Sequence, residues 1–280
     1  MKKLLLAVGS GELKTETLDF ACYLARLSHS RLTGIFHETL DCEEVIVTSM
    51  RDDALHMHTL KDTSMPENDV VRNKGEERID RFKDACTARE VVPHIHRNRG
   101  MPWDELLTEC RYADIIIADA GFSFNSEKAG AIPTHDLKKL LHEAECPVIV
   151  APPGFAQVDE IVLTYDGSPS SVFAIRQFIH LFPEYSDTKV VVLEIRQDDE
   201  NFVDEKYRLK EWLKNHFENI EHVLLQGDSE DRLLEYLLSR TNAFVVMGGY
   251  GRGRLSRLFQ PSASATVLKL LSAPIFVSHP

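Results

Sequence analysis

The sequence lacks two features that would place it in common classes of protein. No apolar run approaches the roughly 20 residues that a helix needs to cross a bilayer, so we expect no membrane span. Basic residues are few: 32 Lys and Arg stand against 44 Asp and Glu, which gives a formal net charge of −12. Because phosphate backbones and anionic lipids repel an acidic chain, a general nucleic-acid or membrane binder is not expected.

Cysteine usage and the N-terminal residues bear on the compartment. The chain has five cysteines, an odd number, all in its first half and without a C-x-x-C pair. This usage favours free thiols in a reducing compartment over a disulfide framework. The apolar stretch at 4–8 is too short for a signal peptide, so we expect a first strand there and a cytoplasmic protein.

What the chain does contain is short apolar runs that alternate with stretches of helical spacing. The predicted strands cover 4–8, 32–36, 91–96, 115–118, 147–150, 161–165, 190–195, 222–225, 244–247 and 274–278. The predicted helices cover 12–27, 70–88, 102–110, 136–144, 171–181, 205–217, 228–239 and 261–271. Strands that alternate with helices predict an α/β fold with a parallel sheet, doubly wound because crossovers are right-handed.

The two halves of the chain repeat one plan. Gly9 matches Asp166, and Pro147 matches Pro274. The two members of the first pair are farther apart along the chain than those of the second pair. The first half therefore contains an insertion, which we place at about 41–71. Repetition at domain length indicates duplication, so we expect two tandem domains, 1–153 and 154–280.

A glycine-rich and arginine-rich stretch at 248–262 follows the predicted strand 244–247 and leads into a helix. A strand, a glycine loop and a helix start together present backbone N–H groups to a phosphate. Arg252, Arg254 and Arg257 add positive charge to a chain that is otherwise acidic. The alternative interpretation is an ordinary solvated loop before a helix.

This stretch resembles the nucleotide-binding branch of the universal stress protein family. That branch ends its fourth strand with Gly, two residues, Gly, nine residues, and then Gly before Ser or Thr. Gly248 and Gly251 fill the first two places and Ser262 the last, but Pro261 replaces the third glycine. Proline suits a helix start but has no N–H to donate, so one phosphate contact is lost.

The resemblance implies two Rossmann-like domains of the adenine nucleotide alpha hydrolase type, in a stress-response factor. It also implies that ATP or another adenine nucleotide binds in the second domain. Most of the implied contact residues follow the carboxyl ends of strands, while Val192 lies on a strand and lines the base pocket and Ser262 and Ala263 lie at a helix start. The implied contacts are Asp166, Gly167, Ser168, Val192, Gly248, Gly251, Arg252, Gly253, Ser262 and Ala263. Asp166 matches the family acid that contacts the nucleoside; its alternative role is to cap the helix that follows.

The first half lacks these residues. Gly9 stands at the Asp166 position, and Asp119, which follows the fourth strand, would repel phosphate. We therefore expect this half to bind no nucleotide. Family domains pair through their last strands, so 147–150 and 274–278 are expected to pair as an internal pseudo-dimer, with a homo-oligomer or protein partner left open.

Catalysis is not expected beyond slow hydrolysis, because the sequence shows no nucleophile–base pair, no carboxylate dyad and no phosphate loop with its lysine. One alternative is an interaction or signalling module that has lost nucleotide binding and uses the insertion to contact partners. Another is a metal-dependent hydrolase that uses His56 with His58, or His94 with His96. Each pair would share one face of a strand, but zinc needs a third or fourth ligand.

Overall fold

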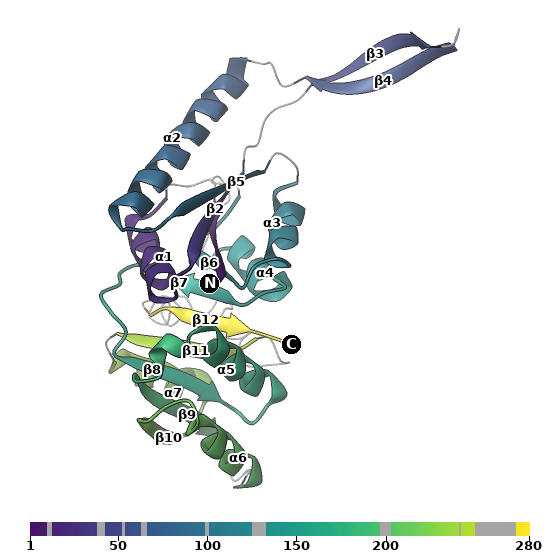
Figure 1. The fold of residues 1–280 in the computed structure, drawn as a ribbon. Coiled ribbons are helices and arrows are strands. Elements are labelled where there is room, and N and C mark those ends of the chain that lie inside the picture. Colours follow the sequence, from purple (N-terminus) through teal and green to yellow (C-terminus); the bar gives the residue numbers. More distant parts are fainter. Residues whose placement is uncertain are drawn as a thin grey trace.

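The core of the molecule is a sheet of ten strands, seen in the computed structural model (Figure 1). The structure describes residues 1–9, 13–37, 43–51, 54–62, 66–98, 101–124, 133–196, 203–240, 242–249 and 273–280. The strands of the first half are β1 (Lys3–Val8), β2 (Arg31–His37), β5 (Pro93–Asn98), β6 (Ile115–Asp119) and β7 (Val148–Ala151). Those of the second half are β8 (Glu160–Tyr165), β9 (Lys189–Arg196), β10 (Ile220–Gln226), β11 (Ala243–Gly248) and β12 (Ile275–Ser278).

The strand order shows that the two halves have one topology. The sheet runs β10-β9-β8-β11-β12-β7-β6-β1-β2-β5, so in each half the first strand lies between the second and the fourth. Neighbouring strands within each half are parallel, whereas β7 and β12 pair antiparallel, with Ile149 opposite Phe276. The predicted α/β fold with parallel sheets is therefore confirmed, and the two five-stranded halves join at one antiparallel pair.

Helices cover both faces of this sheet. One face carries α1 (Thr15–Leu27), α2 (Pro66–Ala88), α5 (Pro169–Leu181) and α6 (Val203–Leu213). The other carries α3 (Pro102–Cys110), α4 (His135–Glu143) and α7 (Ser229–Leu238). Alternate side chains of each strand enter the two resulting apolar layers, as expected for a sheet that is buried on both sides.

Aromatic side chains join the halves within the first of these layers. Phe20 of α1 lies edge-on to Phe155 of the linker, with ring centroids 5.0 Å apart, and to Phe244 of β11, at 6.1 Å. The hydroxyl of Tyr185 donates to that of Tyr23 at 3.2 Å, again across the halves. The core of the second half is therefore continuous with that of the first.

The insertion is where the structure departs from the sequence-based expectation. We expected an insertion at about 41–71 and no strand within it, but β3 (Glu43–Arg51) and β4 (Ala54–Asp62) form a separate antiparallel hairpin. Figure 1 shows the hairpin projecting beyond the end of α2, away from the ten-stranded sheet. The helix expected at 70–88 begins at Pro66, because proline is tolerated in a first turn, where its missing N–H has no helical partner.

Candidate functional site

The turn after β8 is held by its own side chains. Asp166 Oδ1 accepts a hydrogen bond from the Ser168 N–H at 3.0 Å. Gly167 has a φ of +76°, which favours glycine. Ser168 Oγ in turn accepts from the Ser171 N–H at 3.1 Å and is the N-cap of α5. Asp166 therefore does not cap α5, as its alternative role required, but fixes the residue that does.

Gly248 brings the end of β11 against this turn. A Cβ on Gly248 would lie 2.8 Å from the Ser170 carbonyl carbon and 2.8 Å from the Ser171 nitrogen, so no larger residue fits without a shift. Ser170 Oγ also donates to the carbonyl of Gly249 at 2.9 Å. The predicted site residues in 166–168 thus lie beside Gly248, at the carboxyl ends of adjacent strands.

The geometry of this corner suits an anion. The N-terminus of α5 begins here with a partial positive charge, although Pro169 has no N–H to donate and the Ser171 N–H already donates to Ser168 Oγ. Asp166 is exposed at the same corner, so a polar acceptor stands next to the positive end of a helix. A ligand that carries both hydroxyl donors and an anionic group fits this combination.

Val192, the predicted lining residue on β9, lies opposite Leu163 of β8 in the sheet. Only 3% of its surface is exposed, and it packs in the apolar layer beneath α5 and α6. Two residues further along β9, Glu194 accepts from Arg196 Nε at 2.6 Å. This partly buried ion pair was not predicted, since charged residues at a strand end usually indicate solvent exposure.

The remaining predicted contacts, Gly251, Arg252, Gly253, Ser262 and Ala263, lie outside the described residues, as does the predicted helix 261–271. Sequence reasoning also missed the bond from Ser170 to Gly249. The one signal for it is the run of serines at the start of α5, at 168, 170 and 171.

The strand registers identify the equivalent positions in the first half. Leu6 of β1 lies beside Ile117 of β6 just as Leu163 lies beside Val246. These pairs show that an acid and a glycine have changed places between the halves. In the first half, Gly9 follows the first strand and Asp119 ends the fourth. In the second half, Asp166 follows the first strand and Gly248 ends the fourth.

The equivalent corner of the first half is filled. The backbone of Ser123 lies against Gly9, so that a Cβ there would meet the Ser123 nitrogen at 3.0 Å. Lys14 Nζ lies 2.7 Å from Asp119 Oδ1, which also accepts from the Gly121 N–H at 2.7 Å. A packed loop and an internal ion pair thus stand where the second half has its turn and its glycine.

The histidine pairs do not form a metal centre within the described part of the chain. His94 and His96 lie on β5, and His96 Nδ1 is 3.5 Å from Glu109 Oε1. No group of three or more ligating side chains comes together among the residues whose side chains the structure describes. His56 and His58 lie on β4, and their side chains are outside that description.

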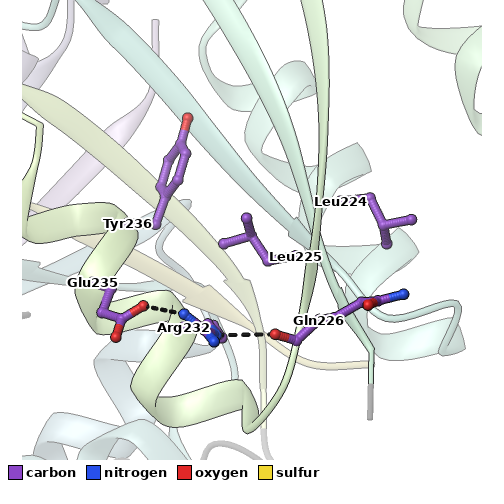
Figure 2. Close-up of a pocket in the computed structure, with 6 residues that line it drawn as sticks. All are labelled: Leu224, Leu225, Gln226, Arg232, Glu235 and Tyr236. Carbon is purple, nitrogen blue, oxygen red and sulfur yellow. Dashed lines mark hydrogen bonds and ion pairs between the residues drawn. The ribbon is translucent and has the colours of Figure 1, made fainter. Parts of the chain in front are cut away.

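A hollow of about 500 Å³ lies at the carboxyl end of β10, beside α7 (Figure 2). Its single cation, among the six described lining residues, is Arg232, which donates to the Gln226 carbonyl at 2.9 Å and to Glu235 at 2.6 Å. Figure 2 shows both bonds drawn across the hollow. Because this guanidinium is already engaged, the hollow is a weaker candidate for an anion than the turn after β8.

Comparison with known proteins gives two kinds of likeness. No family model matches the chain. A curated universal stress protein of Synechocystis sp. is 26% identical over 143 residues, a match that spans 50% of this chain and only 49% of that relative. No helix among the described residues has the length and apolar character of a membrane span.

The structural likeness extends over the whole chain. A universal stress protein from Archaeoglobus fulgidus DSM 4304 superimposes with a TM-score of 0.70 at 15% identity, over 99% of this chain and 98% of that chain. A functionally unknown protein from Pseudomonas aeruginosa PAO1 superimposes with a TM-score of 0.55 at 16% identity, over 100% and 93%. At these identities the superpositions establish the fold.

Proposed function

Since the chain is related in sequence and in fold to the universal stress proteins, we propose that it is a stress-response factor that binds ATP or another adenine nucleotide. The observation that supports this most is the approach of the turn 166–168 to Gly248 beside the N-terminus of α5. This corner offers a nucleotide an exposed carboxylate for its hydroxyl groups and a helix N-terminus for its phosphates.

Most of the predicted residues have a stated role in this proposal. Asp166 accepts hydrogen bonds from the ribose, and Val192 limits the depth of the base pocket. The glycines allow the backbone to approach the phosphates, the helix start donates N–H groups, and an arginine neutralises charge; these residues are Gly248, Gly251, Gly253, Ser262, Ala263 and Arg252.

The proposal assigns the nucleotide to the second half alone. In the first half, Ser123 and the Lys14–Asp119 pair occupy the equivalent corner. We infer no efficient catalysis, because no nucleophile–base pair stands beside the turn among the described residues. Binding without rapid turnover lets the nucleotide act as a signal and not as a substrate.

Calorimetric titration of the full chain with ATP tests the proposal. We expect about one ATP per chain, with loss of binding in Asp166→Ala and Gly251→Val. Asp187→Ala is the matched control, since Asp187 is an exposed aspartate of the same half that lies after η2 (Pro183–Tyr185). No heat at millimolar ATP, or equal loss in the control, would contradict the proposal.

The projecting hairpin supports a second candidate, a protein-interaction module without nucleotide. β3 and β4 form a sheet of their own, and such a projection is a common site of partner contact. The same calorimetry separates the candidates, because an interaction module gives no ATP heat. Replacing 43–62 by a glycine–serine linker leaves ATP binding intact only if the first candidate is correct.

A further inference from the structure

A larger cavity lies between α5 and α6, on the opposite side of α5 from Gly248. It encloses about 880 Å³. This volume is within the range of sites for small organic molecules, which is about 300–1,000 Å³. Of the expected nucleotide contacts that the structure describes, only Gly167 lines it.

The floor and walls of this cavity are apolar and aromatic. Tyr165 and Leu209 form buried parts of its lining, with 5% and 6% of their surfaces exposed. Phe173 of α5 and Trp212 of α6 are half-buried and line it from the two helices. Flat aromatic rings on several sides favour a ligand with a flat apolar body, because rings stack or meet edge to face.

Three cationic or potentially cationic side chains surround this apolar surface. Arg176 and His180 stand four residues apart on α5, so they share one helix face, and Arg208 lies on α6. None of the described lining residues is acidic. In a chain of net charge −12, a group of cations in a lining without acidic side chains calls for an explanation, although Asp166 lies between the lining residues Tyr165 and Gly167 in sequence.

Some arginines elsewhere on the surface are already paired with acids. Arg111 lies 2.7 Å from Glu145, and Arg232 lies 2.6 Å from Glu235. Neither Arg176 nor Arg208 forms an ion pair with any described residue. Two guanidinium groups at an apolar cavity are therefore available for an external anion, which arginine binds with two parallel hydrogen bonds when the anion is a carboxylate.

We propose that the cavity between α5 and α6 binds a small aromatic carboxylate, with its ring against Phe173 and Trp212 and its carboxylate on Arg176 and Arg208. The proposal does not depend on nucleotide binding. Tyr165 and Gly167 line the cavity on either side of Asp166 in sequence, so an occupant would touch the turn that we assign to the nucleotide.

A matched set of probes tests the charge requirement. The probes are 4-phenylbutyrate, 4-phenylbutanol and 4-phenylbutylamine, which share a body and differ in charge. The chain has two tryptophans, so Trp103→Phe leaves Trp212 as a fluorescent reporter in the cavity wall. We expect saturable one-to-one binding that is strongest for the carboxylate and weakest for the amine, with calorimetry as the second readout.

Variants locate the carboxylate. We expect Arg176→Gln and Arg208→Gln each to weaken phenylbutyrate binding by about tenfold and to leave phenylbutanol binding unchanged. Arg81→Gln is the control, since Arg81 is an exposed arginine of α2, in the other half. Asp166→Ala is expected to keep phenylbutyrate binding, which separates this proposal from the nucleotide proposal.

Three results would overturn the proposal of a carboxylate site in this cavity. The first is equal affinity for all three probes, which would indicate apolar partitioning without charge recognition. The second is no saturation up to roughly 10 mM phenylbutyrate, beyond which affinity is too weak to be specific. The third is an equal loss of binding in Arg81→Gln, which would place the effect in overall charge and not in the cavity.

Discussion

Gly248 lies so close to the first turn of α5 that a Cβ on it would stand 2.8 Å from the carbonyl carbon of Ser170. This contact joins the end of β11 to the turn after β8 and gives the proposed site its shape. Glycine is required here for close approach and not for an unusual φ, since Gly248 is not among the glycines with positive φ.

Gly248→Ala tests this contact directly. The added methyl group must push the first turn of α5 away, so we expect a loss of about 1–3 kcal/mol in the free energy of unfolding. Gly154→Ala is the matched control, because a Cβ there meets nothing within 4 Å. Urea unfolding curves measure both, and an equal effect of the two variants would show that Gly248 is not tightly packed.

The aromatic contact between the halves predicts energetic coupling. Phe20 and Phe244 lie edge-on with centroids 6.1 Å apart. A double-mutant cycle with Phe20→Leu and Phe244→Leu is therefore expected to give a coupling energy of about 0.5–1.5 kcal/mol. Phe36, whose ring contacts Phe82, serves as the control, and its pairing with Phe244→Leu should be additive. Additivity in both cycles would mean that the halves are energetically separate.

Buried thiols predict a loss of stability at high pH. The hydrogen bond with Cys22, whose Sγ lies 3.9 Å away, raises the pKa of Cys86 far above its ordinary value of 9.0, and burial raises it further. The folded chain therefore keeps a proton that the unfolded chain releases. This contribution to stability is complete below pH 9 and is lost as the pH rises further.

We expect the free energy of unfolding to fall with pH above about 9, at up to about 1.4 kcal/mol per pH unit for each thiol whose pKa is raised; Cys22, whose pKa is lowered by its hydrogen bond with Cys86, does not add to this fall. Cys146 contributes in the same direction, because its hydrogen bond with Cys110 and its burial raise its pKa. Cys86→Ala should make the decline shallower. Urea unfolding at several pH values measures the slope, and an unchanged slope in the variant would rule out this origin.

Removing the N-cap of α5 is expected to lower the stability of the fold. Ser168 Oγ accepts from the Ser171 N–H, so Ser168→Ala leaves that donor unsatisfied and should cost about 1 kcal/mol. Thr134→Ala is the counterpart in the first half, since Thr134 caps α4 by accepting from the Leu137 N–H at 3.1 Å. We expect both variants to lose stability, but only Ser168→Ala to weaken ATP binding. Weaker ATP binding in Thr134→Ala as well would point to a general effect of stability.

Much of the fold could be predicted from the sequence. The inner strands of the ten-stranded sheet are mostly short apolar runs that are buried on both faces, and such runs are recognisable without an alternating pattern. The helix 102–110 agrees residue for residue with α3, because Pro102 starts it and an acidic first turn suits its dipole. The matched registers at Leu6 and Leu163 are consistent with the duplication inferred from the sequence.

The parts that could not be predicted depend on distant contacts. The hairpin was missed because charged and histidine residues hide the β-branched run at 45–48, and the strand 54–62 has little apolar character. The contact of Gly248 with Ser170 depends on how α5 packs over β11, which no local pattern specifies. The cavity between α5 and α6 likewise arises from helix packing. In the sequence, its residues have the pattern of an ordinary amphipathic helix surface.

A crystal structure of the full chain grown with ATP tests the central claim most directly. The account predicts one nucleotide per chain, with its ribose at Asp166 and its phosphates at the loop that follows Gly248, and none at the corner of Gly9 and Asp119. A nucleotide in the first half, or a crystal at millimolar ATP with the second-half corner empty, would contradict it.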